Sequence, residues 1–151
     1  MQLKPIGYVK NSRTGLDDDN WGNVVSEIII ADTFPEECLD GIEEFSHLEI
    51  ILYFHQSEEN ETVYGAAHPR GNKAFPKVGI FAQRKKDRPN HLGVTIAKFI
   101  SRKGRTLKVK HLDAIDGTPV IDIKPVVKEF LPDGKIKQPQ WMSELMKDYW
   151  K

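Results

Sequence analysis

The chain has 151 residues, a length that suits one domain with a buried core. Its 22 basic and 22 acidic residues balance, and the single cysteine, Cys38, excludes both an intramolecular disulfide and a thiolate metal cluster. The sequence has neither a signal-peptide pattern nor an apolar run of about 18 residues, so we expect a cytoplasmic protein with no membrane partner.

The first half of the chain predicts three strands, over residues 3–9, 24–30 and 48–54. The second of these reads VVSEIII, and its β-branched side chains predict a buried strand. Residues 11–23 collect Gly, Ser, Asn and three aspartates and predict a loop. A short helix is expected to begin with Thr33 or Asp32 as its cap and to end at Gly41.

The second half predicts four strands, over residues 77–83, 92–100, 106–110 and 120–127. A tight turn at 102–105 joins two of them, and this pair is the clearest hairpin in the chain. Residues 140–150 are the one helical stretch, because Trp141, Leu145 and Tyr149 fall on a single stripe. We expect this helix to dock on the rest of the fold or on a partner subunit.

Short strands separated by turns predict a mainly β fold, a single compact antiparallel β-barrel with short peripheral helices. Closing the sheet into a barrel also removes exposed strand edges. We expect one domain over 1–151, with its core in 3–127 and a helical extension at about 139–150.

The balanced charge is unevenly distributed along the chain. Residues 16–61 contain 14 acidic and no basic residues, whereas residues 68–111 contain 13 basic residues and one acid, Asp87. Such segregation can create an anion-attracting face, and it can equally draw together two subunits or two halves of one chain.

Common catalytic and cofactor motifs are absent from the sequence. There is no GxGxxG, GKS/T, HExxH, CxxC or GxSxG, and the five histidines do not have the spacing of metal ligands. We therefore expect no metal site and no Rossmann-type cofactor site. Two stretches remain: the Arg-, Pro- and Gly-rich residues 68–95, which predict ligand-binding loops, and residues 112–125, whose three aspartates surround a Gly-Thr-Pro turn.

These stretches carry a resemblance to a known family. HPRG, GIFAQR, RPNHLGVT, the earlier EEFSHLEIILYFHQ and the later DAIDGTPVIDIKP occur here in order, over roughly residues 3–127. This pattern resembles the TsaA/TrmO-like family of YaeB-like β-barrels. The chain departs from the family at Lys85-Lys86, where Ser-Pro is usual, at His91, where Pro is usual, and at Val126, where Tyr is usual.

The resemblance implies an S-adenosylmethionine-dependent methyltransferase that modifies the threonylcarbamoyl-adenosine beside the tRNA anticodon, and it implies a homodimer. Carried over by motif, the residues that line the cofactor pocket are His55, Gln56, Phe81, Arg84, Asp116, Gly117 and Thr118. The residues that face the RNA are Arg70, Lys85, Lys86 and Arg88. Clustered cations of this kind repel one another unless an anion satisfies them, which favours phosphate.

Methyl transfer from a sulfonium needs alignment more than acid–base power, which suits a site of arginines, turns and aspartates. Asp116 or Asp113 can contact ribose hydroxyls or the methionine amine, and both are candidate catalytic residues. A base for the weakly nucleophilic adenine nitrogen would be Asp113, Asp116 or His111. Two alternatives stay open: a non-catalytic RNA- or nucleotide-binding barrel, and a methyltransferase with another acceptor.

Overall fold

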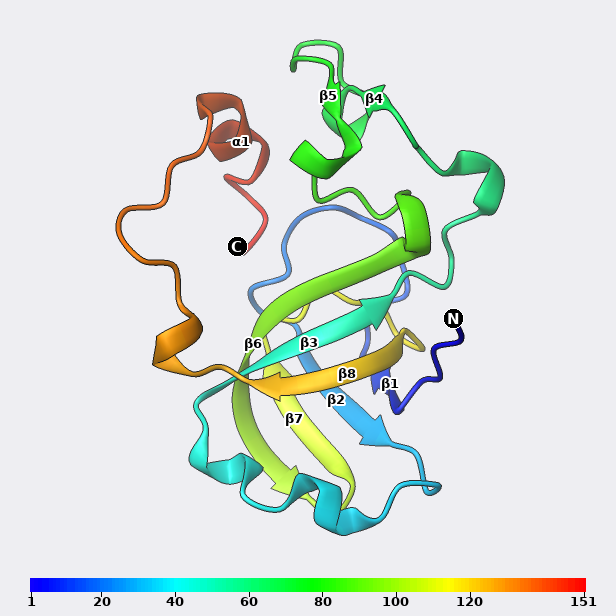
Figure 1. Ribbon diagram of the computed structural model, residues 1–151, viewed down its shortest axis with the longest axis vertical. Coiled ribbons are helices and arrows are strands. Elements are labelled where there is room, and N and C mark those ends of the chain that lie inside the picture. Colours follow the sequence, from blue (N-terminus) through cyan, green and yellow to red (C-terminus); the bar gives the residue numbers. More distant parts are fainter.

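Six of the eight strands form a closed antiparallel barrel in the computed structural model, which describes residues 1–151 (Figure 1). The barrel strands are β1 (Gly7–Lys10), β2 (Val25–Ile30), β3 (His47–Tyr53), β6 (Leu92–Lys103), β7 (Thr106–Lys110) and β8 (Pro119–Pro125). Their order around the barrel is β1-β2-β7-β6-β3-β8, and β8 closes the sheet by pairing with β1. The predicted fold class, a mainly β antiparallel barrel with few helices, is confirmed.

Alternate side chains of the strands fill the barrel. Ile28, Ile50 and Leu107 are fully buried at 0% exposure, and each lies in a different strand of the wall. The predicted strand over 24–30 is present as β2, but only alternate residues face inward, and Ile29 remains 40% exposed. One face of an antiparallel wall can stay in contact with solvent, so β-branched residues do not need two buried faces.

The predicted hairpin of β6 and β7 is confirmed. Lys103 pairs with Thr106 across a two-residue connection, Gly104-Arg105. Gly104 has a φ of +57°, a left-handed conformation that glycine adopts without a steric cost.

The helix predicted near residue 33 is instead two short 3-10 helices, Glu36–Leu39 and Ile42–Glu44. Pro35 occupies the position before the first of them, so the predicted Thr33 or Asp32 cap is wrong. Gly41, at φ +85°, starts the second helix rather than ending the first. Both helices cover the lower end of the barrel in Figure 1, where Leu39 enters the core.

The predicted strand at 77–83 is mostly wrong. Only β5 (Val78–Gly79) pairs, with β4 (Ala66–Ala67), and a 3-10 helix follows at Ile80–Ala82. The side-chain amide of Gln83 donates to the carbonyls of Ala67 (2.9 Å) and Val78 (2.8 Å). This buried glutamine joins the two strands from the side, and the backbone can therefore turn away after β5.

The predicted C-terminal helix is shorter than its periodicity suggested. The helix α1 spans Gln140–Leu145, and the chain continues in turns through residue 150. The remaining 3-10 helices are Glu59–Glu61, Pro69–Gly71, Pro89–His91 and Lys128–Phe130. None of the helices has the length and apolar character that a membrane crossing requires.

Candidate functional site

Three connections meet at one end of the barrel because its strands alternate in direction. Residues 11–24 join β1 to β2, residues 54–91 join β3 to β6, and residues 111–118 join β7 to β8. All predicted site residues lie on these connections. We call this region the loop end of the barrel.

The Asp-Gly-Thr-Pro turn is fixed to the start of the first connection. Oδ1 of Asp116 accepts a hydrogen bond from the backbone N–H of Asn11 (3.0 Å), and the Asp116 N–H donates to the Arg13 carbonyl (2.7 Å). The Asp116 side chain is nevertheless exposed. Gly117 has a φ of +79°, and a Cβ built on it would lie 3.9 Å from Nε2 of His55. The structure thus brings His55 beside the turn, as a shared pocket requires.

Thr118 has a local role within this turn. It is buried, and its hydroxyl donates to the Ile115 carbonyl at 2.8 Å. Sequence analysis did not single out Asn11, whose side-chain amide donates to Ser26 Oγ (2.9 Å) and to the Ala114 carbonyl (2.8 Å). Its position directly after a strand was the one available signal.

The carboxylate of Asp113 accepts hydrogen bonds from two hydroxyl groups, one on each oxygen. Thr95 Oγ1 on β6 donates to Oδ1, and the Tyr149 hydroxyl, which follows α1, donates to Oδ2. Burial raises the pKa of Tyr149 well above its ordinary 10.0, and the adjacent Asp113 carboxylate raises it further. Arg84 acts in the opposite direction on the pKa of this phenol, so its guanidinium lies within electrostatic reach.

This contact predicts a pH dependence of stability. A phenol whose pKa rises on folding holds its proton more tightly in the folded state, so its stabilising contribution is complete below pH 10.0 and is lost above it. We expect the unfolding free energy of the wild type to fall above pH 10 by up to about 1.4 kcal/mol per pH unit more than that of Tyr149→Phe. Urea unfolding at pH 9 to 11 measures this, and parallel curves would contradict the buried contact.

The other predicted cofactor residues lie farther apart. Arg84 donates to the Val94 carbonyl at the start of β6, and Gln56 is exposed beside His55. Phe81 projects into solvent, with 82% of its surface exposed. The structure brings His55 to the turn that contains Asp116 and Gly117, but it gives Phe81 no contact with them.

The basic loop contains its own anion. The buried carboxylate of Asp87 forms salt bridges with Lys86 (Nζ–Oδ1 2.6 Å) and with Lys85 (Nζ–Oδ2 3.3 Å). Burial opposes its ionisation, but the two ammonium groups outweigh this effect and lower the pKa of Asp87 below its ordinary value. Arg88 donates to the Gln83 carbonyl at 2.9 Å. The repulsion that favoured phosphate is therefore relieved within the chain.

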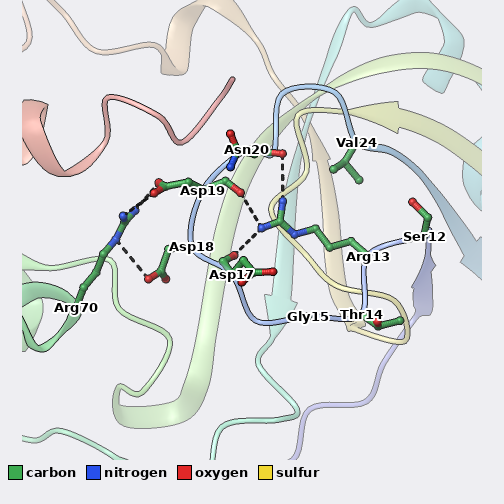
Figure 2. Close-up of a pocket in the computed structure, with 10 residues that line it drawn as sticks. All are labelled: Ser12, Arg13, Thr14, Gly15, Asp17, Asp18, Asp19, Asn20, Val24 and Arg70. Carbon is green, nitrogen blue, oxygen red and sulfur yellow. Dashed lines mark hydrogen bonds and ion pairs between the residues drawn. The ribbon is translucent and has the colours of Figure 1, made fainter.

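Arg70 also has an internal partner. Its guanidinium forms two hydrogen bonds with Asp19 (2.8 and 2.9 Å) and lies 3.5 Å from Asp18. Figure 2 shows Arg70 reaching the acidic loop from one side while Arg13 contacts the loop backbone from the other. Together they border an open cavity of about 770 Å³, lined by Ser12, Arg13, Thr14, Gly15, Asp17, Asp18, Asp19, Asn20, Val24 and Arg70.

Trp21 in the same loop is buried, and the Arg13 guanidinium lies 3.7 Å from its ring centroid. Arg13 is thus a further residue that sequence analysis missed. No group of three His, Cys, Asp or Glu side chains comes close enough to hold a metal ion.

His91, where the family usually has proline, is buried, and its Nε2 lies 2.6 Å from Thr62 Oγ1. Its φ is +48°, a backbone conformation that proline cannot adopt. A smaller cavity of about 230 Å³ lies against this residue, lined by Tyr53, Glu59, Thr62, Tyr64, Pro89, Asn90 and His91.

Fold and site together define a small β-barrel protein with a polar loop end formed by carboxylates, arginines and glycine turns. Residues 12–131 match the model of the family described as the tRNA-methyltransferase O N-terminal domain. The chain belongs to this family.

Relatives of the chain include archaeal and mammalian proteins. A probable S-adenosyl-L-methionine-binding protein of Pyrococcus abyssi is 40% identical over 102 residues, which are 66% of this chain and 52% of the relative. One of Methanothermobacter thermautotrophicus is 35% identical over 132 residues, 85% of this chain and 92% of the relative. The tRNA (adenine(37)-N6)-methyltransferase of Mus musculus is 41% identical over 96 residues, 64% of this chain.

The match spans about half of the Pyrococcus relative and 22% of the mouse enzyme. Among solved structures, TrmO from P. aeruginosa superposes with a TM-score of 0.75 at 23% identity and covers 93% of this chain and 61% of that one. At that identity the superposition supports the barrel fold alone.

Proposed function

We propose that this chain is an S-adenosylmethionine-dependent methyltransferase that methylates N6 of the threonylcarbamoyl-adenosine next to the tRNA anticodon. The observation that carries the proposal is the meeting of the Asp-Gly-Thr-Pro turn with His55 at the loop end of a barrel of this family. The names of relatives support both parts of it, since some are named as S-adenosylmethionine-binding proteins and others as tRNA (adenine(37)-N6)-methyltransferases.

The residues at the loop end fit this cofactor. Gly117 has no side chain on the surface that faces His55, and Asp116 offers an exposed carboxylate for ribose hydroxyls or an amine. The exposed Phe81 ring suits stacking on a base. In the proposed site these three residues line the cofactor pocket with His55, Gln56, Arg84 and Thr118. When bound, the cofactor supplies a methyl group already activated on a sulfonium.

The chain's own task is then mainly alignment. Holding the acceptor nitrogen in line with the methyl group can supply about 7–11 kcal/mol of barrier reduction. Asp116 and Asp113 are the proposed catalytic residues, and Asp116 is the better candidate for proton transfer because its carboxylate is exposed, whereas two hydroxyls occupy that of Asp113. His111 is the weaker candidate, since its ring already packs against Trp150 in a T-shaped arrangement, with the ring centroids 5.5 Å apart.

Calorimetry with S-adenosylmethionine tests the cofactor assignment. At about 100 times its dissociation constant the cofactor should add about 2.7 kcal/mol to the free energy of unfolding and raise the melting temperature. The absence of binding at millimolar cofactor would exclude the enzyme. Labelled cofactor with total tRNA, or with tRNA lacking the threonylcarbamoyl group, then tests the acceptor. Binding without transfer to either tRNA would favour another acceptor.

We propose that Arg70, Lys85, Lys86 and Arg88 contact tRNA phosphates. The ion pairs of Arg70 with Asp18 and Asp19 lie near the surface and contribute only about 0–1 kcal/mol, so phosphate can replace them. Lys85 and Lys86 share the buried Asp87, and an ammonium group has three donors, so each can bind a phosphate while it keeps its contact with Asp87. Replacing one of the four with Ala should weaken tRNA binding and make the log–log salt slope shallower by about 0.7–0.9.

A control for this series is Lys103→Ala, at the opposite end of the barrel, which should leave the slope unchanged. Titrations between 50 and 200 mM salt measure the effect. Four variants with the wild-type slope would remove the RNA-facing assignment.

A homodimer in the cytoplasm completes the proposal. The outward side of β6 exposes Val94 (39%), Ile96 (50%) and Ile100 (46%), apolar surface that a second subunit could cover. Sedimentation equilibrium tests the dimer.

A further inference from the structure

The residues after α1 lie beyond the part of the chain that matches the family, 12–131, yet they dock at the loop end. We call residues 146–151 the strap. Its backbone accepts three hydrogen bonds from successive N–H groups of the β1–β2 connection: Asn20 to Asp148 (3.1 Å), Trp21 to Tyr149 (2.8 Å) and Gly22 to Lys151 (3.2 Å). A ladder of this kind fixes the position of the strap along the loop.

Glycine is required where the strap comes closest. A Cβ built on Gly22 would lie 2.0 Å from the carbonyl oxygen of Trp150, far inside any real contact. The φ of Gly22 is not in the left-handed region, so Gly22→Ala is compatible with its own backbone and conflicts only with the strap. The sequence at position 22 is therefore matched to the docked strap.

The strap carries Tyr149 onto Asp113. With Thr95 on the other oxygen, the carboxylate is held from two sides by hydroxyl donors on separate elements. The ring of Trp150 forms T-shaped contacts with the rings of Tyr149 and His111, with centroid separations of 5.0 Å and 5.5 Å. These aromatic contacts limit the movement of the tyrosine, so the orientation of the carboxylate is fixed from outside the barrel.

We propose that Tyr149 is a positioning residue, which together with Thr95 holds Asp113 as a fixed carboxylate that receives the positive charge of the methyl donor. Each carboxylate oxygen of Asp113 accepts one hydroxyl, which fixes the group and leaves further lone pairs that can face an ammonium or sulfonium group. The inference rests on the proposed function and adds to it a determinant of cofactor affinity that comes from the strap.

A series of three ligands tests this role by binding, without turnover. S-adenosylmethionine carries an ammonium and a sulfonium, S-adenosylhomocysteine only the ammonium, and methylthioadenosine neither. Tyr149→Phe should weaken the binding of S-adenosylmethionine about fivefold. Its affinity for methylthioadenosine, measured by displacement of labelled cofactor, should stay within twofold of that of the wild type. If Tyr149→Phe loses as much affinity for S-adenosylhomocysteine as for S-adenosylmethionine, Asp113 contacts the ammonium group. If it loses no affinity for S-adenosylhomocysteine, Asp113 faces the sulfonium.

Three further variants distinguish a positioning role from general destabilisation of the protein. Gly22→Ala should reproduce the same ligand pattern by displacing the strap, and the double variant should be no worse than either single one. Tyr8→Phe removes a hydroxyl from a half-exposed ring on β1 and should change nothing.

An equal loss for all three ligands would overturn the inference, and so would unchanged or tighter binding of S-adenosylmethionine by Tyr149→Phe. A wild-type protein that binds none of the three ligands would instead refute the proposed function itself, and the inference with it.

Discussion

Ile28→Ala is expected to lower the free energy of unfolding by about 2–5 kcal/mol, the range for large-to-small changes in a packed core. Ile28 lies in β2 at 0% exposure, inside a single cluster formed by all six barrel strands. Removing three carbons there loses buried apolar surface and leaves a cavity that the closed wall cannot easily fill. The change should therefore be among the most destabilising single substitutions in the chain.

Ile29→Ala is the matched control, since it makes the same chemical change one residue along the same strand. Ile29 points outward and is 40% exposed, so its truncation should cost less than about 1 kcal/mol. Urea titration followed by circular dichroism gives both values, and the slope of free energy against denaturant should stay constant. Equal losses at the two positions would contradict the inward and outward alternation of β2.

Local patterns were sufficient to predict much of this barrel. The β6–β7 hairpin follows from two alternating runs around a glycine turn, and its pairing needs only neighbouring residues. The closure of β1 on β8 pairs Gly7 with Val120, and no local pattern encodes a pairing between residues so far apart. The barrel could be expected from the number of strands, but the strand order could not.

Errors arose where tertiary partners replaced local hydrogen bonds. A helical stripe through Tyr149 predicted a helix to residue 150. The carbonyls of Asp148 and Tyr149 instead accept hydrogen bonds from backbone N–H groups of the β1–β2 connection. At residues 77–83, the buried amide of Gln83 bonds to strand carbonyls and takes the place of a longer pairing. Neither partner can be identified by periodicity within a short window.

The charge argument was incomplete for a related reason. Counting cations along the sequence made Lys85 and Lys86 look unsatisfied, yet Asp87 between them and Arg88 accepts both. Opposite ends of the charge pattern also meet in space, because Arg102 forms ion pairs with Glu36, Asp40 and Glu43. Part of the segregated charge therefore joins the two halves of one chain, and a count cannot separate this use from an RNA-binding surface.

The candidate site was predicted in type more than in detail. The sequence indicated the Asp-Gly-Thr-Pro turn and His55, which the fold brings together. It did not indicate Asn11 or Arg13, whose roles depend on contacts with carbonyls of distant or irregular backbone. Polar side chains that hydrogen-bond to distant backbone groups cannot be recognised from a sequence pattern, because their partners can be any residue.

Asp116→Asn is expected to lower methyl transfer at least about tenfold, equivalent to roughly 1.4 kcal/mol, while the cofactor-free protein melts within a few degrees of the wild type. The structural part of the residue survives the change, because an amide oxygen can still accept from the Asn11 N–H and the backbone bond to Arg13 does not involve the side chain. Asparagine also tolerates the same turn conformations. Only the exposed negative charge is lost.

Cofactor titration of the same variant divides the two functional roles of Asp116. Weaker binding of S-adenosylmethionine would assign the carboxylate to ribose or amine recognition, whereas normal binding with slow transfer would assign it to the chemical step. Asp32→Asn, an exposed position that follows β2 at the opposite end of the barrel, is the control and should retain full activity. Full activity in Asp116→Asn would leave the turn with a structural role only, and Asp113, held by Thr95 and Tyr149, would then be the carboxylate on which transfer depends.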